Sequence, residues 1–138
     1  MDPHDLQRFV DAQDGVWERA LAELTAGAKL SHWMWFVFPQ IAGLGNSAMA
    51  QRYAISGLAE ARAYLAHPLL GPRLLACTAA MNGHEGMSAR AILGQPDDMK
   101  FRSSMTLFAA ADPQEPAFRE ALARYFGRVG DEATLARI

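Results

Sequence analysis

Apolar side chains recur at three- and four-residue steps along most of this chain, which is the spacing of one face of an α-helix. The clearest series comprises Leu6, Phe9, Val10, Gln13, Trp17, Leu21 and Leu24. Asp2-Pro3 is expected to open the first helix, because proline suits the first helical position. Asp14-Gly15 interrupts the series and predicts a bend or two consecutive helices, and Gly27 is expected to end the second.

Short helices are predicted for the rest of the chain, each bounded by a capping residue or a helix breaker. The expected boundaries are Ser47 and Tyr53, His67-Pro68, Gly71-Pro72, Ser88 and Gly94, Pro96 and Pro113, Pro116 and Gly127, and Asp131. The pattern therefore predicts an all-α fold, a single multihelical globular domain over residues 1–138.

The segment Trp33 to Ile41 departs from helical spacing. Its continuous run of aromatic and β-branched residues is typical of a buried strand. No other segment alternates with a period of two, so a lone strand would leave backbone groups unpaired. We therefore expect a helical turn followed by an irregular segment over 33–41, packed on the core and stopped by Pro39. The alternative is a strand pair formed across a dimer axis.

Three sequence blocks are distinctive: Lys29-x-Ser-His-Trp-Met-Trp-Phe-x-Phe-Pro-Gln-Ile-x-Gly-Leu-Gly45, Tyr64-Leu-x-His-Pro-x-Leu-Gly71 and Asp97-Asp-x-Lys-x-x-Ser-Ser-Met-Thr-Leu-Phe108. Together they resemble a bacterial family of unknown function, some of whose members are labelled "calpastatin". The resemblance implies a single all-helical domain and brings no established activity or catalytic residue. Leu30 is apolar where such relatives are expected to carry a basic or polar residue. The inhibitor label gains no support, because the inhibitory segments of calpastatin are polar and flexible, whereas this chain is apolar enough to fold.

Composition narrows the classes of partner. The chain has 138 residues, 51% of them hydrophobic, and a formal net charge of −2. Without a basic run, nucleic acid is not an expected partner, and no apolar run approaches the ~20 residues of a membrane span. Cys77 is the only cysteine and cannot form an intramolecular disulfide, which fits a reducing compartment. We expect a cytoplasmic monomer or small homo-oligomer.

Cofactor and metal signals are weak. The four histidines have no paired metal-ligand spacing, and the chain contains neither a Walker loop nor a dinucleotide fingerprint. The expectation is therefore no metal and no cofactor. The acidic pair Asp97-Asp98 is more typical of a helix start, where acids complement the helix dipole.

The first candidate site is the aromatic block with its polar neighbours. Wide apolar side chains beside a few polar ones are typical of a small-molecule pocket, and equally of a core with a polar edge. His32 is the candidate general acid or base; the alternative is an imidazole hydrogen-bonded to a backbone carbonyl. The candidate residues here are Lys29, Ser31, His32, Trp33, Trp35 and Gln40.

The second candidate site lies on the helix predicted after Pro96. Phe101, Met105 and Phe108 form an apolar stripe, and a neighbouring stripe carries polar groups. The polar candidates are Asp97, Lys100, Ser103 and Ser104. A lysine four residues before a serine can activate it as a nucleophile. The alternative is helix packing, with serine bonded back to the helix carbonyls.

Two functional hypotheses follow. In the first, the two candidate sites, about seventy residues apart, converge around a cavity that holds a small anionic molecule, phosphate-bearing or nucleotide-like. A hydrolase or transferase activity there would use His32 for proton transfer. In the second, the protein is a non-enzymatic structural or protein-interaction module, the aromatic block is core and no cavity separates the two segments.

Overall fold

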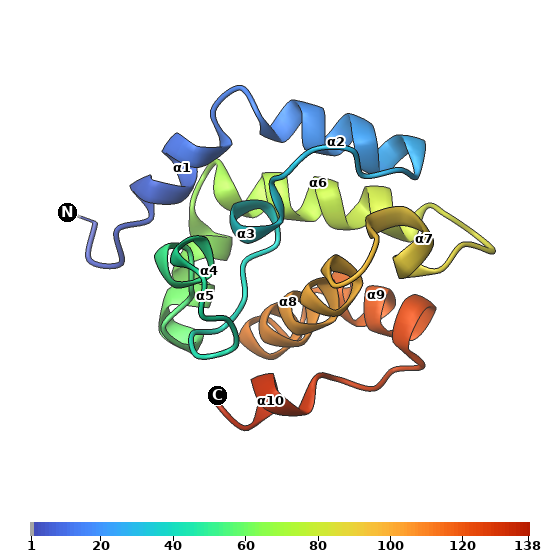
Figure 1. Ribbon diagram of the computed structural model, residues 1–138. Helices are drawn as coiled ribbons and strands as arrows, with labels where there is room; N and C mark the ends of the chain where they lie inside the picture. The colour runs from blue at the N-terminus through green and yellow to red at the C-terminus, as the bar shows by residue number, and fades with distance from the viewer. Residues whose placement is uncertain (1) are drawn as a thin grey trace.

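Helix α8 (Asp97–Ala111) is the central element of the computed structural model, which describes residues 2–138. It packs against α5, α7, α9 and α10 (Figure 1). Ten helices lie within these residues: α1 (Gln7–Gln13), α2 (Trp17–Ala26), α3 (Met34–Val37), α4 (Ala48–Arg52), α5 (Leu58–Ala66), α6 (Leu70–Asn82), α7 (Ala89–Leu93), α8, α9 (Pro116–Phe126) and α10 (Glu132–Leu135). The predicted all-α fold class is confirmed.

Most helix boundaries follow from local capping chemistry. The Ser47 and Ser88 hydroxyls accept the backbone N–H groups of Ala50 and Ala91, at the starts of α4 and α7. Gly27 and Gly127 end α2 and α9 with φ of 78° and 59°, in the left-handed region that glycine adopts without strain. These signals lie within one turn of the boundary, which is why the sequence shows them.

One predicted helix start was wrong, and another differs by one residue. Helix α1 begins at Gln7 rather than at Asp2-Pro3; the Asp2 carboxylate instead accepts the N–H groups of Leu6 (2.8 Å) and Gln7 (2.9 Å) from outside the helix. The carboxylate of the predicted pair thus accepts the N–H groups of residues four and five positions later, rather than those of a helix that starts at Pro3. Helix α6 begins at Leu70, so Gly71-Pro72 lies inside its first turn.

The aromatic segment forms one helical turn and then an irregular stretch, as predicted. Helix α3 ends at Val37, and the backbone continues without regular structure to Ile41. Ile41 forms an isolated parallel bridge with Ile55, in which the Ile55 N–H donates to the Gln40 carbonyl (2.8 Å) and the Ala42 N–H donates to the Ile55 carbonyl (2.8 Å). The Gln40 carbonyl and the Ala42 N–H, which a lone strand would leave unpaired, therefore have partners within the chain.

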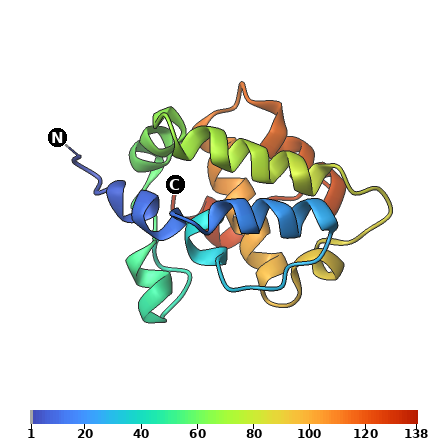
Figure 2. The same ribbon diagram turned by 90° about the horizontal axis from the view of Figure 1, so that it is seen from above.

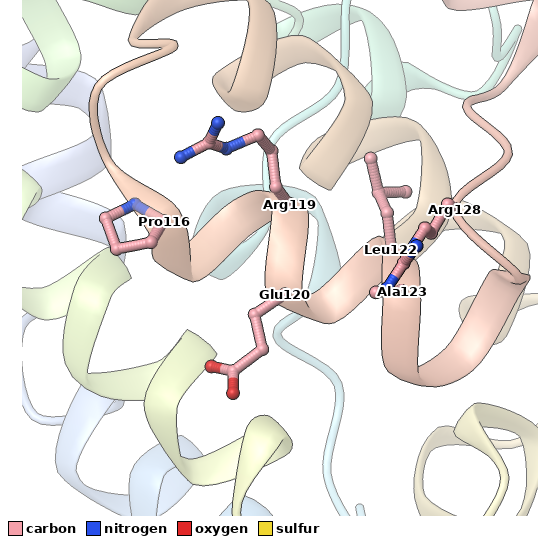
Figure 3. A pocket seen from close by; sticks show the side chains of 6 residues that line it. All are labelled: Pro116, Arg119, Glu120, Leu122, Ala123 and Arg128. Atoms are coloured by element: carbon pink, nitrogen blue, oxygen red, sulfur yellow. The ribbon is translucent and has the colours of Figure 1, made fainter.

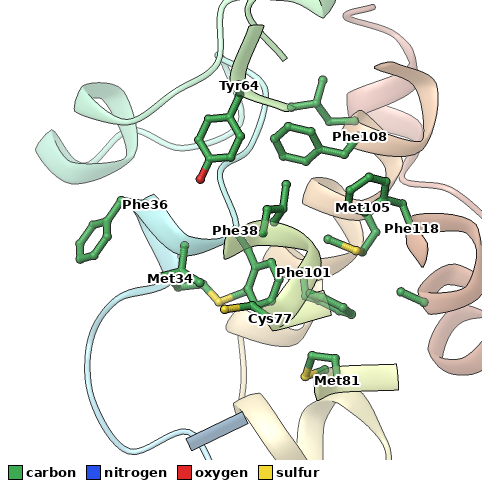
Figure 4. Packing of buried hydrophobic residues seen from close by; sticks show 14 of the residues in the cluster. Met34, Phe36, Phe38, Tyr64, Cys77, Met81, Phe101, Met105, Phe108 and Phe118 are labelled. Atoms are coloured by element: carbon green, nitrogen blue, oxygen red, sulfur yellow. The ribbon is translucent and has the colours of Figure 1, made fainter. Parts of the chain in front are cut away.

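The helices enclose one core. Helices α2 and α6 lie side by side in both views, with α8 and α9 on the other side of α6 (Figures 1 and 2). Aromatic rings fill the centre: Phe38 packs edge-on against Phe101 with ring centroids 4.9 Å apart, and Tyr64 packs against Phe108 at 5.4 Å (Figure 4). Edge-to-face and tilted packing at these distances is favourable for aromatic pairs. Phe38 thereby anchors the irregular stretch to α8.

Helix α8 is buried on nearly every face after its first turn. Phe101, Met105 and Phe108 are fully buried, as the apolar stripe predicted, but Ser104 and Thr106 are buried too. Small hydroxyl side chains allow neighbouring helices to approach closely, and the Thr106 hydroxyl donates to the Arg102 carbonyl within the helix (2.8 Å). The N-terminal end of α8 is its most exposed part, and Arg102, Ala109 and Ala110 are half-buried further along the helix.

None of the helices in residues 2–138 combines the length and apolar character needed to cross a bilayer.

Candidate functional site

One backbone contact brings the two candidate sites together. The Lys29 N–H, two residues beyond the Gly27 cap of α2, donates to the Ile92 carbonyl near the end of α7 (2.8 Å). Gly94 then ends α7, and α8 begins three residues later. Because α7 leads directly into α8, tying Lys29 to α7 places its side chain beside the first turn of α8.

The two lysines of the chain meet at one carboxylate. Lys29 Nζ lies 3.0 Å from Asp97 Oδ2, and Lys100 Nζ lies 3.3 Å from Asp97 Oδ1. The side chains are 8%, 28% and 18% exposed for Lys29, Lys100 and Asp97 respectively. The aromatic segment and the helix after Pro96 are therefore neighbours in space, and Lys100 is the more accessible ammonium.

Each ammonium also lies near the face of an indole ring. Lys29 Nζ is 5.1 Å from the Trp33 ring centroid, and Lys100 Nζ is 5.5 Å from the Trp35 centroid, both within the range of a cation–π interaction. Trp33 is fully buried, whereas Trp35 is half-buried. We call Lys29, Trp33, Trp35, Asp97 and Lys100 the lysine–tryptophan cluster; Trp35 and Lys100 form its accessible side.

Glu23 organises the loop before this cluster, and the sequence analysis missed it. Its carboxylate accepts hydrogen bonds from the Trp33 indole (2.9 Å), the Ser31 hydroxyl (2.6 Å) and the backbone N–H groups of Leu30 (2.8 Å) and Ser31 (3.0 Å). Burial disfavours the charged form and by itself raises the pKa, but these four hydrogen bonds outweigh it and lower the pKa of Glu23 from 4.5 to about 2. No local signal in the sequence marked it, because an acid on a helix is usually solvated. Ser31 and Trp33 are thus held by Glu23.

The two serines of α8 face other parts of the protein. The Ser103 hydroxyl lies 3.2 Å from the Met99 carbonyl and 3.2 Å from Asp131 Oδ2, so it joins α8 to the cap of α10. Ser104 is fully buried, and its hydroxyl has no hydrogen-bond partner among the described residues. Neither serine is hydrogen-bonded to Lys100. The contact of the Ser103 hydroxyl with a carbonyl of its own helix agrees with helix packing, the alternative to a nucleophilic serine.

His32 and Gln40 lie at the edges of the aromatic segment. His32 is exposed, between the half-buried Ser31 and the buried Trp33. Gln40 lines a cavity of about 190 Å³ together with the loop Gly43 to Gly45 and helix α4. The side chains of Lys29 and Lys100 do not line that cavity.

The other two cavities described here are also away from the cluster. One, of about 470 Å³, follows α9, and one, of about 270 Å³, lies between α5 and the end of α8. Gln40 is the only predicted site residue that lines any of the three. The lysine–tryptophan cluster is therefore a surface feature rather than the wall of one of these cavities.

The chemistry open to the cluster is binding through charge and ring contact. Two ammonium groups share the Asp97 carboxylate beside a half-buried indole, and Asp98 adds a second carboxylate to the same first turn of α8. Cys77 offers no nucleophile, because burial raises the pKa of its thiol to about 12. Across residues 2–138, no three His, Cys, Asp or Glu side chains gather closely enough to hold a metal ion.

Comparison with known proteins places the chain in a family. A family model described as "Protein of unknown function (DUF1810)" matches residues 3–138. The crystal structure of the conserved hypothetical protein Rv1873 from Mycobacterium tuberculosis is similar, with a TM-score of 0.96 and 54% sequence identity over 98% of this chain and 96% of that chain. No curated protein matches. Because the family model covers nearly the whole sequence, this chain belongs to the family of unknown function DUF1810.

Proposed function

We propose that this protein binds a small anionic molecule at the lysine–tryptophan cluster. The observation that supports the proposal is that Lys29 and Lys100, the only two lysines of the chain, meet at Asp97 with an indole ring beside each ammonium. A lysine that served only for solubility would have no need of both a carboxylate and a ring at fixed positions.

The charges in the cluster favour a phosphate-bearing ligand over a simple carboxylate. Asp97 already occupies one side of each ammonium, so an incoming anion competes with it for Lys100. A phosphate carries more charge and more acceptor oxygens than a carboxylate, and it gains more from two neighbouring cations. Lys100, with 28% of its side chain exposed, makes the direct contact, and Lys29 holds Asp97 in position.

Trp35 supports a ligand that also contains a flat ring. Its indole is half-buried and lies under the Lys100 ammonium, so one part of the ring system is available to solvent. Stacking on an aromatic side chain contributes about 1–3 kcal/mol per nucleobase in proteins that bind single strands. A mononucleotide, with a phosphate and a flat base, combines both features.

Binding, rather than turnover, is the core of the proposal. A hydrolase or transferase would require a group that moves a proton, and His32 is the candidate. It is exposed and immediately precedes Trp33 of the cluster. Incubation with AMP, followed by phosphorus NMR, tests for turnover; if it occurs, His32→Ala should abolish it while leaving AMP binding unchanged.

The competing hypothesis of a non-enzymatic structural or interaction module is supported by one half of the cluster. Trp33 is fully buried and hydrogen-bonded to Glu23, and only 8% of the Lys29 side chain is exposed. Under that hypothesis, the cluster closes the polar edge of the core and binds nothing.

Calorimetric titration with AMP, inorganic phosphate and adenosine separates the two hypotheses. Binding of AMP that weakens with added salt and is lost in Lys100→Met supports the proposal, because Lys100→Met keeps the apolar stem but removes the charge. Arg19→Met, at an exposed position of α2, is the matched control and should leave binding unchanged. Equal affinity of the wild type and Lys100→Met, or no heat with any of the three compounds, would contradict it.

A further inference from the structure

The outer face of α9 carries a groove that the lysine–tryptophan cluster does not use. It has a volume of about 470 Å³ and is lined by Pro116, Arg119, Glu120, Leu122, Ala123 and Arg128 (Figure 3). This volume is within the usual range for small-molecule sites. The groove shares no residue with the lysine–tryptophan cluster, so each can be tested without disturbing the other.

Helical spacing places most of the lining on one stripe. Pro116, Arg119 and Ala123 are three and four residues apart, and the rise of 1.5 Å per residue makes the stripe about 10 Å long. At its C-terminal end, Gly127 turns the chain and the Arg128 N–H donates to the Leu122 carbonyl (3.0 Å). The Arg128 backbone is thus fixed at one end of the groove.

The floor of the groove is apolar and its charged groups are unbalanced. Within residues 2–138, neither Arg119 nor Arg128 has a carboxylate within ion-pair distance. The one acid of the lining, Glu120, is engaged by Arg124 (3.5 Å) and by the Asn82 amide (3.2 Å). Figure 3 shows its carboxylate pointing away from the Arg119 side chain. Two guanidinium groups therefore flank Leu122 and Ala123 without neutralisation.

We propose that this groove binds a small amphipathic carboxylate, with an aliphatic or aromatic body on the floor and its carboxylate on Arg128. A planar guanidinium matches a carboxylate through two parallel hydrogen bonds, which a point-charge ammonium does not offer. The apolar body covers Leu122 and Ala123, and Arg119 adds favourable charge at the other end of the stripe. A neutral molecule of the same shape would gain the apolar contact but not the guanidinium contact.

NMR titration of the nitrogen-15-labelled full chain with octanoate tests the proposal, with octanamide as a neutral ligand of the same length. We expect saturable amide shifts confined to α9 and residues 127–129, with half-saturation at about 1 mM or below. Octanamide and the Arg128→Gln variant should each weaken binding about tenfold, the loss of one charge-assisted hydrogen-bond pair. Arg90→Gln, an exposed arginine of α7, is the control and should bind as the wild type does.

A second variant tests the floor. Ala123→Glu places a negative charge in the groove on a residue that favours helix, so the fold should persist by circular dichroism while octanoate binding is lost. Equal affinities for octanoate and octanamide, octanoate binding unchanged in Arg128→Gln or Ala123→Glu, or shifts spread over the whole chain would overturn the proposal.

Discussion

The indole N–H of Trp33 donates a 2.9 Å hydrogen bond to Oε1 of Glu23, ten residues earlier in the chain. The same carboxylate also accepts both backbone N–H groups of Leu30 and Ser31 and the Ser31 hydroxyl. One buried acid at the end of α2 therefore fixes the loop that carries Lys29 and the ring over which the Lys29 ammonium lies. The geometry of the lysine–tryptophan cluster depends on this contact.

Acidification should weaken the fold through Glu23. Burial opposes ionisation, yet the hydrogen bonds to its carboxylate lower the pKa from 4.5 to about 2. The stabilisation from this lowered pKa is fully present above the unfolded-state value near 4.5 and is lost as the pH falls through the folded-state value near 2. The difference corresponds to at most about 3 kcal/mol. Urea unfolding at a series of pH values measures it.

Glu23→Gln isolates this contribution. The variant should be less stable at neutral pH and should lose less stability on acidification than the wild type. Glu18→Gln, at an exposed position of the same helix, should retain the wild-type pH dependence. If the free energies of unfolding of Glu23→Gln and the wild type changed equally with pH, Glu23 would have the same pKa in the folded and unfolded states, and the prediction would be wrong.

Gly71→Ala should destabilise the protein although alanine is the better helix former by about 1 kcal/mol. An added Cβ at Gly71 would lie 2.1 Å from the backbone carbonyl oxygen of Leu65, so α5 and α6 would have to move apart. We expect a loss of about 3 kcal/mol, at the upper end of overpacking effects. Thermal and urea unfolding measure the change.

Gly57→Ala is the matched control for that substitution. Its φ of 172° is extended backbone open to any residue, and an added Cβ would meet nothing within 4 Å. Its effect should stay within about 1 kcal/mol in either direction. If the two substitutions changed the free energy of unfolding equally, α5 and α6 would be able to move apart without loss of stability, which would contradict the prediction.

Arg8→Lys should destabilise the fold by about 2–4 kcal/mol. An ammonium cannot keep the planar contact with the buried Glu60 carboxylate and also donate to all the carbonyls that the guanidinium contacts. The Arg8 and Glu60 side chains are 9% and 5% exposed and are joined at 2.8 Å. The Arg8 guanidinium also donates to the carbonyls of His4, Asp5, Arg52 and Ala54. Arg19→Lys, at an exposed position, is the control and should leave the free energy of unfolding unchanged. If Arg8→Lys also left it unchanged, the Arg8 guanidinium would not stabilise the fold as proposed.

Local signals predicted much of the fold. The Ser47 and Ser88 caps and the Gly27 and Gly127 ends each depend on atoms within one turn, so the sequence displays them. The start of α1 was misplaced because its cap comes from Asp2, outside the helix and four residues before Leu6. At this helix, the proline pattern predicted the start less well than the Asp2 carboxylate, which accepts backbone N–H groups four and five residues later.

The candidate site was predictable only in part. Lys29 and Lys100 were predicted as polar neighbours of apolar segments, and the fold brings them together at Asp97. Nothing in the sequence marked Glu23 as buried, because an acid on a helix is usually solvated. Likewise, helical spacing placed Ser103 near Lys100, but nothing local predicted that its hydroxyl would contact Asp131, 28 residues later.

The sequence by itself determined the helical periodicity, most helix ends and the single helical turn in the aromatic segment, because these depend on steric and hydrogen-bonding preferences of residues a few positions apart. Only the tertiary structure decided which polar groups meet: Glu23 with Trp33, Lys29 with Asp97, and Arg119 and Arg128 along one groove. Such pairs form between segments distant in sequence, and their geometry is set by how the helices pack around α8 rather than by any local preference.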